Sequence, residues 1–343
     1  MYAVTLTESE LRQIDTVTSS LAAKFDSVND PVFLRDSTVY AHELPDRLRA
    51  ELNTFRHEES GGVLSIRGHV IDDTRIGPTP KHWRSQTGRA ATLPTEIYFV
   101  LCAALLGDVV GWSTQQDGRI MHDILPIKGH ENEQLGSGSK ELLTWHTEEA
   151  FHPLRADYLG LACLRNPDSV ATTFASVDDL DLSEDLRDLL GKKRYPIRPD
   201  RSHLPQNRGE TQHLSAREEA LLTRSYEWIT NLDSHPEHVS ILFGDPAAPY
   251  LRIDPYFMEE AYADTESAAA MTGIVDAVDR AIREHILEPG EVLFLDNYKI
   301  VHGRVPFTAR FDGTDRWLKR LSVARDLRKS RDRRMSHTAR VIY

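Results

Sequence analysis

From residue 109 onward the sequence alternates short strand-like runs with turns that contain Gly and Pro. The runs cover residues 119–128, 143–148, 157–165, 238–243, 250–254, 291–296, 300–304 and 316–323. Many short strands separated by such turns are typical of a jelly roll or barrel, whereas a parallel α/β sheet needs strands that alternate regularly with helices. We therefore expect a mainly β chain with flanking helices, whose core is a double-stranded β-helix, or jelly roll.

The first 108 residues have a different pattern, which predicts helices. In residues 8–25, apolar side chains recur at the spacing of one helix face, and Thr7 with Glu10 matches a capping box at its start. Further elements are expected as a helix near 44–56, a buried strand at 61–68, a loop at 72–94 and a buried helix at 95–106. This part of the chain is expected to cover the β core as a helical layer.

Three helical segments interrupt the strands of the core, at 183–190, 216–229 and 265–286. The chain has 343 residues, which is near the top of the range for one domain, and it contains no internal repeat. We expect one domain with a helical N-terminal layer over about 1–108, a jelly-roll core over about 109–325 and an insert over about 177–235. Within the insert, the polar segment 196–215 is expected to act as a lid.

The overall charge argues against a protein that binds nucleic acid or an anionic membrane. Lys and Arg number 41 and Asp and Glu number 53, so the formal charge is −12. The basic stretch from Arg325 to Arg334 has no aromatic residues between its charges. It is therefore expected to be a solvated segment at the end of the chain rather than a nucleic-acid site.

No charged and then apolar leader opens the sequence, and its longest apolar run, 97–107, is roughly half as long as a bilayer span requires. The two cysteines, Cys102 and Cys163, lie in apolar runs and are expected to be buried thiols. These features predict a cytoplasmic protein. The oligomeric state stays open, and a homodimer is among the states that the sequence allows.

A His-x-Glu pair, His146 and Glu148, lies within the stretch from Trp145 to Pro153. In an extended segment, side chains two residues apart point to the same face, so both could contact one ion. A second histidine, His302, follows a strand-like run and a turn far downstream. Two imidazoles and one carboxylate are the ligands of non-haem Fe(II) oxygenases, and a zinc hydrolase could use the same three groups.

Two arginines favour the oxygenase over the hydrolase. Arg316 and Arg320 share one face if segment 316–323 is a strand. If the co-substrate is 2-oxoglutarate, its far carboxylate needs a buried cation, and the planar arginine side chain binds a carboxylate through two hydrogen bonds. The second arginine could bind a second carboxylate. A zinc hydrolase needs neither arginine, and a non-catalytic sandwich that binds a ligand is the third alternative.

Several ordered stretches carry a resemblance to a known family. They are Gly111–Gly118, Trp145–Phe151, Leu164–Asp168, Asp296–Asn297 with Val301–Arg304, and Asp312–Arg320. They closely resemble the clavaminate synthase-like Fe(II)/2-oxoglutarate oxygenases. Within that group, the chain is most similar to the β-hydroxylases of free arginine and enduracididine in peptide-antibiotic pathways. The likeness runs from about residue 30 to the C-terminus.

The resemblance implies a role for residues at the matching positions. His146, Glu148 and His302 would be the iron ligands, and the co-substrate would be 2-oxoglutarate with O2. Arg316 would pair with the C5 carboxylate of 2-oxoglutarate, and Thr172 would contact the same molecule.

The resemblance also implies contacts to an amino acid substrate. Arg320 would take its α-carboxylate, and Gln115 together with Glu148 would hold its α-amino group. Gly136 and Ser137, in the loop 135–139, would line the pocket beside the iron.

At the far end of the substrate, Asp200 and Asp254 match acidic positions that bind a guanidinium in the arginine hydroxylases. A further aspartate of the viomycin-type pattern is replaced here by Tyr256, which can hydrogen-bond or stack on a guanidinium but cannot supply a charge. A free guanidino amino acid hydroxylated at Cβ (C3) is therefore expected. Lysine or ornithine as substrate, and hydroxylation at Cγ (C4), stay open as alternatives.

Overall fold

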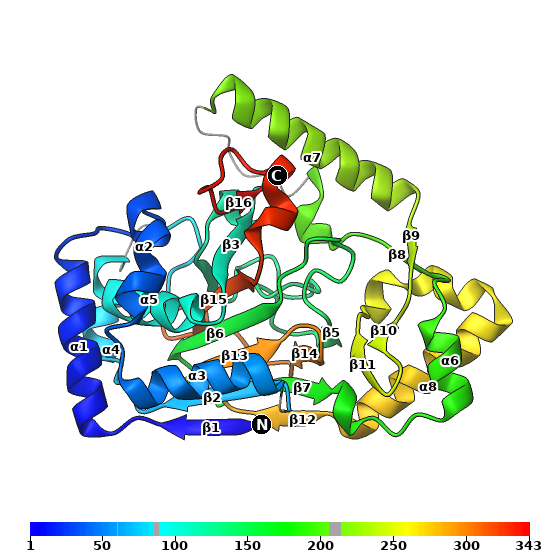
Figure 1. Cartoon of the computed structure of the whole chain (residues 1–343), viewed down its shortest axis with the longest axis horizontal. Coiled ribbons are helices and arrows are strands. Elements are labelled where there is room, and N and C mark those ends of the chain that lie inside the picture. Colours follow the sequence, from blue (N-terminus) through cyan, green and yellow to red (C-terminus); the bar gives the residue numbers. More distant parts are fainter. Residues whose placement is uncertain (60, 86–88, 206–213) are drawn as a thin grey trace.

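The computed structural model describes residues 1–59, 61–85, 89–205 and 214–343. Its largest sheet consists of β1 (Tyr2–Thr5), β2 (Val63–Arg67), β3 (Asp108–Trp112), β4 (His122–Ile124), β6 (Tyr158–Arg165), β13 (Val292–Asp296), β15 (Trp317–Ala324) and β16 (Val341–Ile342). In space the order is β1-β2-β13-β6-β15-β3-β16, and β4 pairs with β15 (Figure 1). Strands from distant parts of the sequence are thus neighbours in one sheet.

A smaller sheet packs against this large sheet. It has the order β12-β7-β14-β5, formed by β5 (Leu143–His146), β7 (Thr172–Ser176), β12 (Arg283–His285) and β14 (Ile300–Arg304). One apolar cluster joins the two sheets: Leu161, Leu295 and Leu318 come from the large sheet, and Phe174 and Ile300 from the small one. The expectation of a mainly β chain with flanking helices is confirmed.

Strand β6 shows that the large sheet is buried on both faces. Tyr158 belongs to the cluster on the helical side, whereas Leu159 and Leu161 belong to the cluster between the sheets, as the alternation of side chains in a strand requires. Gly160 leaves room for the ring of Phe99, because a Cβ at this glycine would lie 2.8 Å from that ring. Burial on both faces explains why this strand reads as a nearly continuous apolar run.

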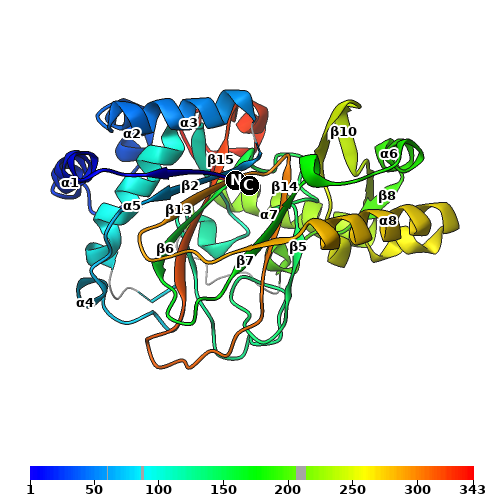
Figure 2. The same cartoon turned by 90° about the horizontal axis from the view of Figure 1, so that it is seen from below.

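Helices cover the outer face of the large sheet, gathered on one side of the molecule in both Figure 1 and Figure 2. They are α1 (Glu8–Ala22), α2 (Pro31–Ala41), α3 (Asp46–Glu58), α4 (Asp73–Ile76) and α5 (Arg89–Ala104). Helix α5 packs on the sheet through Phe99, whose ring centroid lies 5.7 Å from that of Phe294 in β13. The predicted capping box of α1 is present, with Thr7 accepting from the backbone of Glu10 and the Glu10 side chain accepting from the backbone of Thr7.

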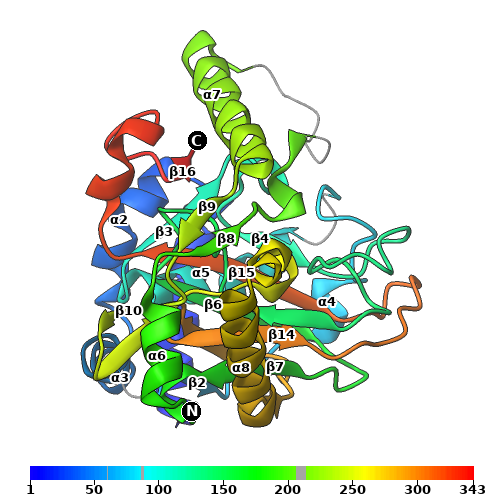
Figure 3. The ribbon, with the colours of Figure 1, turned by 90° about the vertical axis from the view of Figure 1, so that its right-hand side faces the viewer.

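A second lobe lies on the opposite side of the sheets, where α6 and α8 face the viewer in Figure 3. It contains α6 (Glu184–Gly191), β8 (Tyr195–Ile197), α7 (Ala216–Ser234), β9 (Glu237–Val239), β10 (Leu242–Asp245), β11 (Ala248–Leu251) and α8 (Thr265–Ala281). Strand β8 pairs with β9, and Leu190, Ile229 and Met271 share one apolar cluster. The second lobe therefore does not end with the expected insert over 177–235, because the residues from β9 to α8 belong to it as well.

Short 3-10 turns connect these elements. They are η1 (Gln116–Gly118), η2 (Val177–Asp179), η3 (Arg201–His203), η5 (Pro255–Phe257), η6 (Glu259–Ala263) and η7 (Leu327–Arg333). The expected lid, 196–215, includes β8 and η3, but its residues 206–213 lie outside the described part of the chain.

Some local predictions are wrong. The expected loop at 72–94 contains α4 and the beginning of α5, which accommodates Pro94 inside the helix. The helix expected to reach residue 286 ends at Ala281, because the next residues pair with β7 as strand β12. The strand expected at 119–128 is reduced to β4. Helix α2 and strands β3 and β7 were not predicted, although Asp30-Pro31 is a typical helix start.

Both ends of the chain join the large sheet. The expected helical layer over 1–108 also contributes β1 and β2, and β16 pairs with β3 beyond the expected end of the core at 325. Arg334 is only 2% exposed and donates hydrogen bonds to the carbonyl groups of Leu327 and Ala339. The prediction of a solvated basic tail is therefore wrong for this residue. Both cysteines are buried free thiols, as expected. Within the described ranges, none of the helices is long and apolar enough to cross a membrane.

Candidate active site

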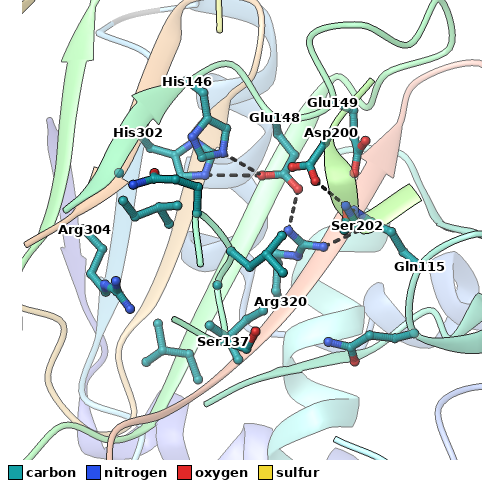
Figure 4. A pocket seen from close by; sticks show the side chains of 18 of the residues that line it. Gln115, Ser137, His146, Glu148, Glu149, Asp200, Ser202, His302, Arg304 and Arg320 are labelled. Carbon is teal, nitrogen blue, oxygen red and sulfur yellow. Dashed lines mark hydrogen bonds and ion pairs between the residues drawn. The ribbon is translucent and has the colours of Figure 1, made fainter. Parts of the chain in front are cut away.

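Two histidines and one glutamate converge at the edge where the small sheet meets the large one (Figure 4). His146 ends β5 and is the register partner of His302 in the antiparallel strand β14, with ring centroids 4.6 Å apart. Glu148 follows in the turn after β5, and its Oε2 lies 3.7 Å from Nε2 of His146 and 3.3 Å from Nε2 of His302. One ligand atom from each residue lies within 4.8 Å of the others, and this is the only such group of three or more among the described residues.

The surrounding backbone holds this group in place. The carbonyl oxygen of Thr144 lies 2.8 Å from Nδ1 of His146, so a proton on Nδ1 leaves Nε2 free to bind a metal. Asn297 is 1% exposed and clamps the turn that carries Glu148. Its side chain accepts from the backbone N–H of Glu148 and donates to the carbonyl groups of Glu148 and Ala156. The motif containing Asn297 was recognised in the sequence, but its role was not.

The electrostatics favour an anionic Glu148. Burial alone would raise its pKa, but the charge of Arg320 and the hydrogen bonds from the two histidines hold the pKa well below its usual range. Burial would lower the pKa of His146, but the contacts with Glu148 and the charge of Asp254 raise it to about 9. Burial lowers the pKa of His302. Two imidazoles and a carboxylate with converging lone pairs fit a divalent iron with open coordination positions.

Beside this group lies a buried arginine without a carboxylate partner. Arg316 is 5% exposed, and one of its Nη atoms donates to the hydroxyl of Thr172 at 3.3 Å. Its Nε makes no hydrogen bond, and no ion pair to Arg316 occurs among the residues that the structure describes. Burial lowers its pKa to about 10, so it stays charged at neutral pH. A buried and unpaired cation that lines a cavity fits an anionic ligand such as the far carboxylate of 2-oxoglutarate.

Arg320 belongs to β15, four residues after Arg316, and lies between Glu148 and Gln115. Its guanidinium donates to Oε1 of Glu148 and, at 3.1 Å, to Oε1 of Gln115. The same group lies 2.9 Å from Nδ1 of His122, whose pKa burial lowers to about 3. A neutral His122 can therefore accept from Arg320. The structure brings Gln115, Glu148 and Arg320 together as expected.

The two expected aspartates line the same cavity from the second lobe. Asp200 caps η3, where its Oδ1 accepts from the backbone N–H of Ser202 at 2.6 Å. Asp254 caps η5, and burial together with the charge of Asp200 raises its pKa to about 7, against the opposing charge of His146. Tyr256 does not line this cavity. It lines a neighbouring one, and its ring lies 5.5 Å from the guanidinium carbon of Arg201.

The loop with Gly136 and Ser137 also lines the cavity, and a third arginine holds it. Arg304, at the end of β14, is 4% exposed and donates to the carbonyl groups of Gly138 and Glu141. Sequence reasoning gave Arg304 no role. Because Arg304 and His302 both belong to β14, Arg304 connects this loop to the strand that carries His302.

The cavity has a volume of about 360 Å³, within the usual range for small-molecule sites. Both sheets and the second lobe contribute to its walls. Its lining includes two cations, Arg316 and Arg320, and two acids that come from the second lobe, Asp200 and Asp254. The arrangement suits a molecule with a carboxylate at one end and a cation at the other.

A family model described as taurine catabolism dioxygenase TauD, TfdA family, matches residues 102–322. The chain is 47% identical over 343 residues to an enduracididine beta-hydroxylase of Streptomyces hygroscopicus, and the match covers 100% of both chains. It is 42% identical over 344 residues to an L-ornithine/L-arginine 3-hydroxylase of Catenulispora acidiphila, again over 100% of both. Clavaminate synthase 2 of Streptomyces clavuligerus is a more distant relative, at 32% identity over 86% of this chain and 84% of the relative.

A solved structure of the non-heme iron oxygenase OrfP, in complex with Fe, succinate and (3S)-hydroxy-L-Arg, matches the whole chain. The TM-score is 0.91 and the sequence identity 44%, with 100% of both chains covered. The resemblance to the clavaminate synthase-like oxygenases and to the guanidino amino acid hydroxylases, which the sequence motifs indicated, is confirmed.

Proposed function

The chain belongs to the taurine catabolism dioxygenase TauD, TfdA family, and from this we propose that it is an Fe(II)/2-oxoglutarate-dependent hydroxylase of a free L-arginine-like (guanidino) amino acid, acting at Cβ (C3). Relatives that match the whole chain include an enduracididine beta-hydroxylase and an L-ornithine/L-arginine 3-hydroxylase. The cofactor is Fe(II), and the co-substrates are 2-oxoglutarate and O2. Natural-product biosynthesis is the proposed setting.

One observation carries the proposal: a single cavity is lined by a His-Glu-His group, by two aspartates and by Arg316, a buried arginine for which the described residues offer no ion-pair partner. His146, Glu148 and His302 would hold the iron. Arg316, with Thr172, would bind the C5 carboxylate of 2-oxoglutarate. Bound to these residues, iron and 2-oxoglutarate supply the oxidising chemistry, in which O2 provides one oxygen atom to the substrate and one to succinate, with release of CO2.

The other residues of the cavity would place the substrate. Arg320 would exchange its contact with Glu148 for the substrate α-carboxylate, and Gln115 with Glu148 would receive the α-amino group. Asp200 and Asp254 would bind the guanidinium, and Gly136 and Ser137 would close the wall beside the iron. Fixing both ends of the amino acid sets which carbon faces the iron, and a water-excluding cavity protects the reaction.

Tyr256 has no place in this proposal as a stacking partner of the guanidinium, because it lies outside the cavity. With two acids and no stacking ring, lysine or ornithine remains the alternative substrate, and C4 the alternative position. The name of one relative includes ornithine, which supports testing it.

For the architecture, we propose that the two packed sheets form a double-stranded β-helix core within one domain. The helices α1–α5 would be its N-terminal layer, and the second lobe the insert that closes the cavity. The packing of the small sheet against the large one through a shared apolar cluster supports this proposal.

The test is anaerobic reconstitution with Fe(II) and 2-oxoglutarate, followed by O2, with succinate and product mass measured for arginine, enduracididine, homoarginine, lysine, ornithine and citrulline. We expect one added oxygen on a guanidino amino acid and about one succinate per product. Product from lysine or ornithine alone would keep the reaction and overturn the substrate. Activity without 2-oxoglutarate in a zinc-loaded protein would instead favour a hydrolase.

A further inference from the structure

His203 is fully buried at the end of η3 and contacts two segments of the active site. Its Nδ1 lies 2.6 Å from the hydroxyl oxygen of Thr114, in the turn that carries Gln115. Its Nε2 lies 2.5 Å from Oε2 of Glu149, the residue after Glu148, as a close contact of two buried polar atoms without the angle of a hydrogen bond. Sequence reasoning did not identify this histidine.

The short turn η3 rigidly connects His203 to Asp200. The Asp200 carboxylate accepts from the backbone N–H of Ser202, and the backbone N–H of His203 donates to the carbonyl of Asp200 at 3.0 Å. The Ser202 hydroxyl accepts from Nε2 of Gln115 at 2.9 Å. These contacts leave little freedom between the buried ring and the carboxylate that lines the cavity.

The other partner, Glu149, is also held in an unusual way. Its backbone has a φ of 51°, a left-handed conformation that is unfavourable for residues other than glycine. Its side chain is buried, with only 2% exposure, and lies against His203 rather than against the metal ligands. Strain of this kind is maintained where the surroundings hold the residue firmly, which is common beside functional sites.

The second aspartate, Asp254, is connected to the segment around Glu148 by a different set of hydrogen bonds. The backbone N–H of Thr147 donates to the carbonyl of Ile253 at 2.8 Å, and the backbone N–H of Ile253 donates to the Thr147 hydroxyl at 3.2 Å. Asp254 therefore follows a residue bonded to Thr147, which lies between the iron ligands His146 and Glu148. Each acid of the cavity is thus connected to a neighbour of Glu148 through one other residue. Asp200 is connected to Glu149 through His203, and Asp254 is connected to Thr147 through Ile253.

We propose that His203 is a positioning residue that sets the distance between Asp200 and the iron ligands, and with it the carbon of the substrate that is hydroxylated. It contacts neither iron nor substrate, and it acts through Glu149 and Thr114. The inference rests on the proposed function and deepens it, since it assigns the choice of carbon to a contact outside the cavity.

The test compares His203→Phe with wild type. Phenylalanine keeps a ring against Phe151, whose centroid lies 5.0 Å from that of His203, but loses both polar contacts. We expect the ratio of succinate to hydroxylated arginine to rise by a factor of about five, the equilibrium factor that corresponds to one buried hydrogen bond. We also expect a mixture of C3 and C4 products and unchanged Fe(II) affinity. His203→Gln, which can keep one of the two contacts, should show a smaller rise.

A matched control is His69→Phe. His69 also contacts a threonine hydroxyl, that of Thr95 at 3.2 Å, and packs on an aromatic ring, that of Tyr98 with centroids 4.9 Å apart, but it does not line the cavity. This variant should keep the wild-type ratio and product. If His203→Phe and His69→Phe both give the wild-type ratio and product, the inference is overturned.

Two measurements guard against other failures. Thr114→Val removes one hydroxyl and should raise the ratio in the same direction even if His203→Phe does not fold; a wild-type ratio in Thr114→Val together with an unfolded His203→Phe would count against the inference. Amide hydrogen exchange in 195–204, measured without substrate, should be faster in His203→Phe than in wild type. If wild type hydroxylates no guanidino amino acid, the proposed function fails, and unchanged exchange would then overturn the positioning role as well.

Discussion

His146 and His302 lie directly opposite each other on the antiparallel strands β5 and β14, with their ring centroids 4.6 Å apart. Because register partners in a sheet point to the same face, this pairing aims both imidazoles at Glu148. The metal group is thus built from one strand pair and one turn. The strand pair supplies the two histidines. The turn after β5 supplies Glu148, and Asn297 holds this turn through hydrogen bonds to the backbone of Glu148.

Asn297→Ala should weaken Fe(II) binding by a factor of about 10–100, because residues that orient metal ligands contribute on this scale. Anaerobic titration with Fe(II) measures the change. Asn297→Asp should have an Fe(II) affinity between those of wild type and Asn297→Ala. Aspartate can still accept from the backbone N–H of Glu148, but it cannot donate to the two carbonyl groups. Asn166→Ala is the control: Asn166 is a buried asparagine that bonds the backbone of Val170 and Leu287. Equal loss of iron affinity in both alanine variants would contradict the clamp.

Arg316→Met should raise the KM for 2-oxoglutarate by a factor of about 30 or more, since removal of one partner of a buried charged pair costs at least about 2 kcal/mol. The same change should leave the Tm of the protein without ligands unchanged or higher, because it removes a buried charge for which the described residues offer no carboxylate partner. Thermal unfolding with and without 2-oxoglutarate and Fe(II) tests both parts. Ligand binding should raise the Tm of wild type but not of the variant. Arg310→Met, which removes an exposed arginine paired with Asp168, should respond like wild type. A normal KM in Arg316→Met would exclude the assigned role.

Asp254 should impose a pH dependence on substrate capture. Its pKa is raised to about 7, so the carboxylate that attracts a guanidinium is lost as pH falls below about 7. The kcat/KM for arginine should then fall about tenfold per pH unit in the acid range, since this quantity follows the free enzyme. The Asp254→Asn variant should have a lower kcat/KM for arginine, but this kcat/KM should not change with pH in the acid range. An acid limb that persists in Asp254→Asn would assign it to another group.

Asp254 should also make the stability of the folded protein depend on pH. The pKa in the folded protein lies above 3.8, the ordinary value for an aspartate, so the folded protein binds the proton more tightly than the unfolded chain. Protonated Asp254 therefore favours the folded state at low pH, and this contribution is lost as pH rises through about 7. Asp254→Asn should raise the Tm more at pH 8 than at pH 5. Thermal unfolding at the two pH values checks this, and a larger gain at pH 5 would refute it.

Tyr256→Phe should leave the KM and kcat for arginine within about twofold of wild type, as is usual for changes away from a functional site. The ring lies in the neighbouring cavity beside Arg201, so loss of its hydroxyl changes no group in the active-site cavity. Steady-state kinetics on arginine test this. A large rise in KM would restore the direct role that sequence comparison assigned to this tyrosine.

Local pattern was sufficient for the features that depend on near neighbours in the chain. The capping box at Thr7 and the apolar run of β6 could both be interpreted from adjacent residues, because side-chain direction in a strand or helix repeats with a fixed period. His146 and Glu148 do meet as expected, but the strand expected at 143–148 ends at His146, and Glu148 lies in the turn that follows. The family resemblance added Gln115, Thr172, Asp200 and Asp254, and the structure places all four at one cavity. Local pattern predicted most of α5, as a buried helix at 95–106, but it failed for the start of α5 and for the end of α8. There, tertiary packing and pairing with β7 override the apparent breaker or continuation.

The sequence by itself therefore determined which side chains could bind iron, an acid and a cation, since these are chemical properties of single residues. Only the tertiary structure decided how those groups are held. The contacts His203–Glu149, Arg304–Gly138 and Asn297–Ala156 join segments that are far apart in the chain. It also moved Tyr256 out of the cavity, although it lies two residues from Asp254. Such contacts arise from the packing of the sheets and the second lobe, and no local spacing encodes them.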